Sequence, residues 1–144
     1  MAQVNRPFIV PAQPSGKYLN LNDAFFDGTL DLAGDAIVEK VTANSNSFAT
    51  ADFTGCSAIT FICMRSNGLS TVGIEDSPLL LSCDFSDNEL DEAAVDGVLA
   101  DLDSFGLSNG FVDVSGGTNA PPSAAGLTSK ANLEGKGWTV TVNV

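Results

Sequence analysis

Apolar residues recur along the middle of the chain with a period of 21 residues. Three segments align without a gap, and each has apolar residues at its first, fourth, sixth and eleventh positions and asparagine at its ninth. They span residues 38–48, 59–69 and 80–90, and the same offset aligns Leu30 with Ala51 and Val72. A fixed period of this size is typical of a solenoid, whose stacked repeats bury a core that no single repeat could bury alone.

The fourth and sixth positions of each repeat flank an outward residue, which predicts a short strand with its apolar side chains on one face. Stacking the repeats should pair these strands in parallel on one side of the solenoid. The outward residues then form three rows. These rows are Lys40, Phe61, Ser82 and Phe111; Thr42, Cys63, Asp84 and Asp113; and Asn44, Arg65, Ser86 and Ser115.

The ninth position of the three repeats is occupied by Asn46, Asn67 and Asn88. An asparagine amide both donates and accepts hydrogen bonds, so it can satisfy backbone groups left open where the chain leaves a strand. Stacked one above another, the three side chains are predicted to form a structural ladder. The alternative is that each is simply a turn residue.

The pattern L-x-x-L-x-L-x-x-N-x-L, with other apolar residues in place of some leucines, resembles the leucine-rich repeat. Residues 51–56 (A-D-F-T-G-C) are similar to the short bacterial, internalin-like form of that repeat. The resemblance covers residues 30–90 best. It implies an α/β leucine-rich repeat solenoid with parallel strands on one face, and longer repeats with helices on the other side are common in that family.

The solenoid is expected to span residues 17–144, with 21-residue repeats at residues 30–92. Residues 17–29 are predicted to cap it, because a solenoid must seal the open end of its core. Phe25 and Phe26 have the bulk to do so. Tyr18-Leu19-Asn20-Leu21 alternates like a strand within this cap.

Residues 1–16 are predicted to form an extended N-terminal arm. They contain three prolines, and each proline biases the residue before it toward extended backbone. The arm also carries Phe8, Ile9 and Val10. These apolar residues favour docking onto a partner or a neighbouring subunit; the alternative is a loose terminal tail.

Residues 93–144 are expected to form longer strand–helix units and a closing strand, which places two helices in the C-terminal half. Asp91 is the predicted N-cap of the first helix, and Ser123 is that of a second helix running to about Leu133. Residues 138–144 alternate in polarity and predict the closing strand.

The end of the chain is similar to the ending of small structural proteins of tailed bacteriophages. The similarity is carried by N-A-P-P-S at residues 119–123 and K-G-W-T-V-T-V-N at residues 136–143. It implies that the chain is a virion component.

Charge and composition exclude several functions. The chain has 18 acidic and 6 basic residues, and its net charge of −12 disfavours nucleic acid and anionic membranes as partners. It has no histidine, so histidine bases, ligands and triads are absent. The first residues lack the apolar segment of a secretory signal, so we expect synthesis in a host cytoplasm and release by assembly or lysis.

The three cysteines show no disulfide or metal-binding spacing. Cys83 falls on an inward position, Cys63 on an outward position and Cys56 on a turn. All three are predicted to be free thiols.

Acidic residues crowd residues 84–96, which raises the possibility of a calcium loop. The spacing of an EF-hand is absent, which favours a solvated loop and helix start. No nucleophile has a recognisable base nearby in the pattern. We therefore expect neither catalysis nor a metal or cofactor.

The outward face of the strands is the predicted binding surface. Phe61 and Phe111 lie on it with Lys40 and Arg65, and aromatic residues and arginine commonly anchor interfaces. The alternative is that both phenylalanines pack on adjacent loops. The sequence thus predicts a non-enzymatic bacteriophage virion protein, such as a capsid decoration, head-fibre or tail-associated protein. It would contact other virion proteins or copies of itself. A bacterial adhesion or recognition module is the alternative.

Overall fold

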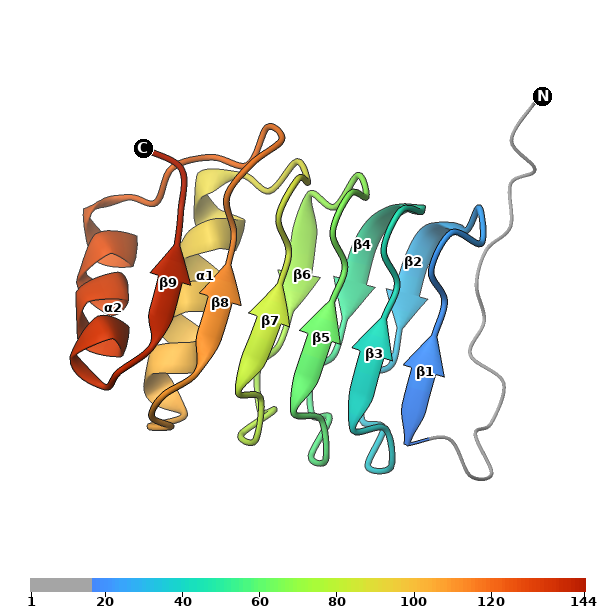
Figure 1. Ribbon diagram of the computed structural model, residues 1–144, viewed down its shortest axis with the longest axis horizontal. Coiled ribbons are helices and arrows are strands. Elements are labelled where there is room, and N and C mark those ends of the chain that lie inside the picture. Colours follow the sequence, from blue (N-terminus) through green and yellow to red (C-terminus); the bar gives the residue numbers. More distant parts are fainter. Residues whose placement is uncertain (1–16) are drawn as a thin grey trace.

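The computed structural model describes residues 17–144 and shows a solenoid of parallel strands (Figure 1). The predicted solenoid is confirmed in its parallel strands along one face and in the two helices of its C-terminal half. The expected arm, with Phe8, Ile9 and Val10, lies outside the described residues.

The larger sheet has six parallel strands in the order β1-β3-β5-β7-β8-β9. Their bounds are β1 Tyr18–Asn20, β3 Lys40–Thr42, β5 Phe61–Cys63, β7 Ser82–Asp84, β8 Phe111–Asp113 and β9 Thr139–Thr141. Lys40 is paired with Phe61, Phe61 with Ser82, and Ser82 with Phe111. The register of the sheet is therefore the one predicted for the first outward row, with an offset of 21 residues up to Ser82 and a longer one to Phe111.

The closing strand is shorter than predicted, because it covers Thr139–Thr141 rather than residues 138–144. Trp138 lies between the turn at residues 136–137 and the strand, and the pairing with β8 begins at Thr139. Its backbone N–H donates to the carbonyl of Leu133 at 3.1 Å, and its indole N–H donates to the carbonyl of Leu107 at 2.8 Å. The buried indole ring of Trp138 is thus part of the core in the last repeat.

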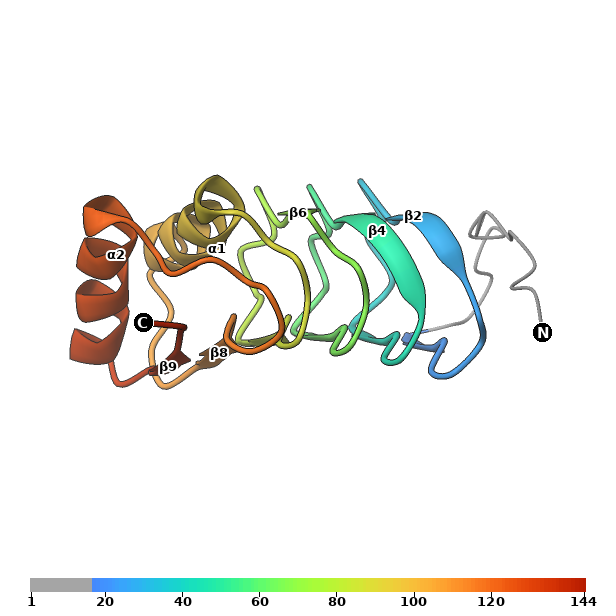
Figure 2. The same cartoon turned by 90° about the horizontal axis from the view of Figure 1, so that it is seen from above.

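A second sheet of three parallel strands was not predicted. It contains β2 (Asp27–Asp31), β4 (Ser47–Asp52) and β6 (Thr71–Gly73), and it lies across the core from the larger sheet (Figure 2). Leu30, Ala51 and Val72, which the period aligns, are partners in this sheet. An irregularity between Gly28 and Thr29 shifts its register and breaks the alternation that signals a strand.

The two helices take the place of this second sheet in the C-terminal repeats (Figure 2). Helix α1 (Glu92–Ser104) is capped by Asp91, whose carboxylate accepts from the N–H of Ala94. Helix α2 (Ala124–Gly135) is capped by Ser123 and ends two residues beyond the predicted Leu133. A helix advances about 1.5 Å per residue against about 3.3 Å in a strand, so helical repeats need more residues for the same path.

The core runs continuously between the two layers. The inward residues Val41, Ile62, Cys83 and Val112 are fully buried. At the N-terminal end, the ring of Phe26 stacks on Phe48 with centroids 6.0 Å apart. The prediction that Phe25 also seals this end is wrong: its φ of +58° directs the side chain outward, and the residue is 72% exposed.

The three cysteines are free thiols. Cys56 is fully buried at its turn and its Sγ donates to the carbonyl of Leu32 at 3.1 Å. Burial raises the pKa of Cys56 to about 11, and burial also raises the pKa values of Cys63 and Cys83. Cys63 differs in being only half-buried, on the outward face of β5.

We expect Cys63 to react first when the folded protein is treated with iodoacetamide near pH 8, because a thiol must be both accessible and ionised to be alkylated. Peptide mapping by mass spectrometry measures the order. All three cysteines should react at similar rates in guanidinium chloride, and the melting temperature should not depend on reductant. An intact mass two hydrogens lighter would contradict the free-thiol assignment.

Candidate functional site

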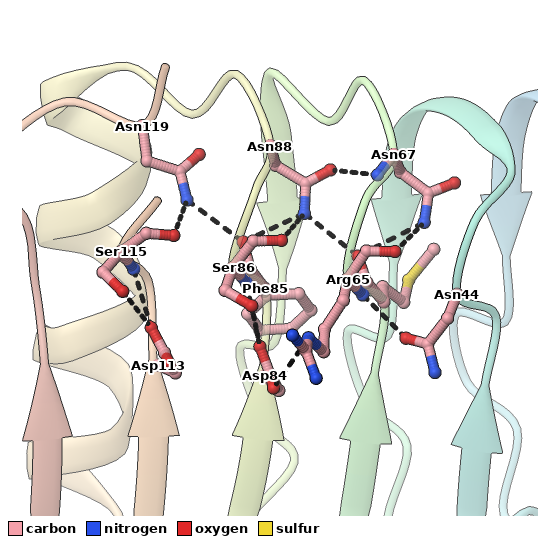
Figure 3. Close-up of polar contacts among 11 residues, drawn as sticks. Asn44, Arg65, Asn67, Asp84, Phe85, Ser86, Asn88, Asp113, Ser115 and Asn119 are labelled. Carbon is pink, nitrogen blue, oxygen red and sulfur yellow. Dashed lines mark hydrogen bonds and ion pairs between the residues drawn. The ribbon is translucent and has the colours of Figure 1, made fainter. Parts of the chain in front are cut away.

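An asparagine ladder lies where the chain leaves the strands of the larger sheet (Figure 3). Each ladder amide donates to carbonyls of its own repeat and of the preceding repeat. Asn67 Nδ2 donates to the carbonyls of Met64 at 3.2 Å and Ala43 at 2.9 Å. Asn46 makes the equivalent bonds to Ala43 at 3.2 Å and Leu21 at 2.7 Å.

Asn88 has the most buried of these three ladder amides, and the residue is 1% exposed. Its Nδ2 donates to the carbonyls of Met64 at 3.0 Å and Phe85 at 2.9 Å. Its Oδ1 accepts from the N–H groups of Asn67 at 3.2 Å and Leu69 at 3.1 Å. One side chain thus satisfies backbone donors and acceptors in two adjacent repeats.

Asn119 is a further member of the ladder that the sequence reading missed. Its Nδ2 donates to the carbonyls of Phe85 and Val114, both at 3.1 Å, and its Oδ1 accepts from Leu90 N–H at 2.9 Å. It follows Val114 by five positions, whereas Asn46 follows Ala43 by three. Gly116 and Gly117, both with positive φ, lie in this longer turn. The spacing of the other repeats therefore does not reveal Asn119 as a ladder residue.

The residue before each predicted ladder asparagine has left-handed backbone. Ser45, Ser66 and Asp87 have φ values of +57°, +56° and +56°. This conformation is unfavourable for residues other than glycine, so it persists only where the surroundings impose it. The backbone N–H of each bonds to a carbonyl of the next repeat, such as Ser45 to Arg65 at 3.0 Å. The stacked repeats therefore hold the turn.

The first outward row of the larger sheet places a lysine between two aromatic rings. Lys40 Nζ is 5.3 Å from the ring centroid of Tyr18 and 4.6 Å from that of Phe61, which are cation–π distances. Tyr18 is 51% exposed, Phe61 is half-buried, and Phe111 further along the row is 37% exposed. These aromatic rings are accessible from the solvent side of the sheet.

The next rows hold two fixed carboxylates (Figure 3). Asp84 Oδ1 accepts from the backbone N–H of Ser86 at 2.9 Å and from its hydroxyl at 2.6 Å. Asp113 accepts from Ser115 in the same way at 2.9 and 2.7 Å. Arg65 Nε lies 3.7 Å from Asp84 Oδ2. The carboxylates are held in defined positions on the face.

The outward face of the six strands is nearly neutral although the whole chain carries −12. Of the 18 acidic residues, only Asp84 and Asp113 fall within those six strands. Lys40 lies on the same strands, and Arg65 closely follows β5. The strand face, meaning the outward side chains of these strands and of Arg65, therefore carries no net charge, whereas the molecule as a whole is acidic.

A shallow hollow lies between β6 and α1, on the other side of the solenoid. It is lined by Glu75, Asp76, Pro78, Asp101, Ser104 and Phe105. Burial, and then the charges of Glu75 and Asp76, raise the pKa of Asp101. Within residues 17–144, no group of three or more acidic or cysteine side chains is arranged to hold a metal ion. Nor does this part of the chain contain a helix long and apolar enough to cross a bilayer.

No family model matches the sequence, and comparisons with curated proteins and with solved structures found no match either.

Replacing Asn88 with alanine should lower the free energy of unfolding by roughly 1–3 kcal/mol or more, because buried N–H and carbonyl groups lose their partners. A urea melt measures the loss. Asn20→Ala is the control, since Asn20 is exposed and bonds only the nearby N–H of Asn22. Equal stability of the two variants would show that the ladder contributes little.

Replacing Asp101 with asparagine should raise the melting temperature at pH 7. A raised pKa means that the folded state disfavours the ionised carboxylate, so the wild type is destabilised above its unfolded-state pKa. The difference should disappear as pH falls below that value, where the carboxyl is protonated in both states. Melting curves at pH 7 and about pH 3 test this, and a difference that persists at the lower pH would show another cause.

Proposed function

We propose that this chain is a non-enzymatic structural protein of a bacteriophage virion, built as a leucine-rich repeat solenoid and acting through protein–protein contacts. The observation that carries the proposal is the strand face, where Lys40 lies between Tyr18 and Phe61. Accessible aromatic residues beside basic side chains are typical of the groups that anchor protein interfaces.

The leucine-rich repeat assignment is supported by the roles of the repeated positions. The fourth and sixth positions are buried on either side of an outward strand residue, as Val41 and Ala43 are around Thr42 of β3. The ninth position supplies the asparagine that bonds two repeats. A sequence pattern and a set of hydrogen bonds thus favour the same repeat type.

The virion assignment is supported by the resemblance of residues 119–123 and 136–143 to the ending of phage structural proteins. In this fold the segments lie together. Asn143 Nδ2 donates to the carbonyl of Asn119 at 2.8 Å, and Trp138 closes the core. The resemblance therefore falls on one structural unit, the last repeat.

Attachment to the particle is assigned to residues 1–16. This segment carries Phe8, Ile9 and Val10, and it contains Arg6 but no acidic residue. The rest of the chain carries all 18 acidic residues. An apolar, basic segment next to an acidic solenoid suits contact with a capsid or tail protein, while the strand face is left for neighbouring subunits.

The experiment is to purify particles of the source phage on a density gradient and to look for this chain by mass spectrometry. Recombinant protein is then added to particles that lack it. Deleting residues 2–16 should weaken binding by at least about tenfold, which corresponds to about 1.4 kcal/mol. The melting temperature should stay nearly unchanged, since the repeats are intact.

Phe25→Ser is the control variant, because Phe25 is highly exposed and lies off the strand face. It should bind particles as the wild type does. Absence of the chain from purified particles would contradict the virion role. Binding of the solenoid to a bacterial surface instead would favour an adhesion module.

A further inference from the structure

The strand face is electrically polarised along the sheet. Its cations lie on the N-terminal side, with Lys40 on β3 and Arg65 after β5. Its carboxylates lie on the C-terminal side, with Asp84 on β7 and Asp113 on β8. The sign changes between β5 and β7, which are adjacent strands in the middle of the six.

This arrangement is self-complementary under a twofold axis. An axis parallel to the strands and passing between β5 and β7 places β5 of one copy over β7 of another, and β3 over β8. Lys40 then faces Phe111 of the second copy and lies one row from its Asp113. Arg65 lies one row from Asp84 of the second copy, and it also lies 3.7 Å from Asp84 of its own chain. Every contact occurs twice, as a closed symmetric interface requires.

The same axis also matches side chains by size. Because the axis is parallel to the strands, equivalent rows remain at the same height. In the first row, Tyr18 faces Thr139 of the second copy, and Phe61 faces Ser82. A large side chain thus meets a small one at each end and at the centre, which suits the interdigitation of two packed sheets about 10 Å apart.

The rest of the described chain is strongly acidic. Sixteen of the 18 acidic residues lie outside these six strands, so two copies that approach by other described surfaces tend to bring like charges together. The six strands of the larger sheet also lie side by side in one row from β1 to β9, so a second sheet can lie along them (Figure 1).

We infer that the strand face is a homodimer interface, in which a second copy packs face to face about an axis between β5 and β7. This inference rests on the proposed function in one respect, that the strand face is a protein–protein surface. It names the partner as the chain itself.

The first test is the mass of the purified full-length chain in solution. Analytical ultracentrifugation should show a concentration-dependent equilibrium between monomer and dimer. A chain that stays monomeric up to about 1 mM, where even binding of about −4 kcal/mol would be visible, overturns the inference.

The second test mixes two charge variants. Lys40→Glu places a carboxylate diagonal to Asp113 of a second copy, and Asp113→Lys places an ammonium group diagonal to Lys40. Each variant alone should dimerise at least about tenfold more weakly than the wild type, since like charges then face each other. An equimolar mixture should restore dimerisation: in the mixed dimer one contact pairs the two introduced charges, which are opposite, and the other pairs the original lysine and aspartate.

Matched variants outside the strand face serve as controls. Lys130→Glu on α2 reverses a positive charge, as Lys40→Glu does, and Glu89→Lys after β7 reverses a negative one, as Asp113→Lys does. Both control variants should dimerise as the wild type does. Circular dichroism checks that every variant is folded. If Asp113→Lys does not fold, Asp113→Asn removes the charge with little change of shape and should also weaken dimerisation, because Lys40 of the second copy loses the nearby carboxylate.

Two outcomes of the mixing experiment overturn the inference. One is that folded single variants dimerise as strongly as the wild type, which would place the dimer contact elsewhere. The other is that the folded mixture remains monomeric. Both are independent of particle binding: a monomeric chain found in virions would leave the proposed function intact, and a dimer absent from virions would contradict only that function.

Discussion

The hydrogen bonds of the asparagine ladder are the interaction on which the solenoid depends. Where the chain leaves a strand, its carbonyl groups turn away from the neighbouring backbone, and inside a core they have no water to bond. Asn67 and Asn88 supply the missing donors, and each also accepts from the backbone of the preceding repeat. Because an unsatisfied buried polar group is costly, only one stacking register leaves all of these groups paired. Hydrophobic burial drives the repeats together without direction, and the amides select how they align.

The register of the strands determines which side chains of each repeat lie on the outer surface. A strand shifted by one residue would exchange its inward and outward side chains, so Val41 would meet solvent and Lys40 would be buried. With the ladder in place, Lys40 lies between Tyr18 and Phe61, which belong to different repeats far apart in the chain. The left-handed turns at Ser45 and Ser66 are part of the same mechanism, since they direct the ladder amides back over the strand ends. The arrangement of side chains on the strand face is therefore a consequence of the backbone hydrogen bonding beneath it.

The six-stranded sheet and both helices follow from the sequence because their signals are strong and local: a fixed period, alternation within each strand, and the caps Asp91 and Ser123. Other features depend on conditions that a pattern does not carry. The second sheet was missed because a bulge near Gly28 interrupts its alternation. Asn119 was missed because its turn is two residues longer than the others. Phe25 points outward and has a positive φ, a backbone conformation that the residue type does not predict. The site residues on the strands were accessible to prediction, because the alternation within each strand places their side chains on the outward face.

The electrostatics of the strand face restrict what can bind there. Asp84 and Asp113 each accept two hydrogen bonds from a serine, so their positions are set before any partner arrives. Covering a carboxylate without a cation, or an ammonium without an anion, leaves an uncompensated charge out of water. Arg65 and Asp84 lie 3.7 Å apart in the same chain and compensate each other, so a partner must above all carry an anion near Lys40 and a cation near Asp113, at the spacing of the sheet. An unrelated protein has to evolve that arrangement, whereas a second copy has it by symmetry.

The net negative charge acts in the opposite direction, because two acidic chains repel at long range. Salt screens this repulsion over about 8–10 Å at physiological ionic strength and leaves close contacts largely unscreened. Association through this face should consequently depend on contact chemistry more than on long-range attraction, which is the behaviour expected of a component that assembles only at high local concentration.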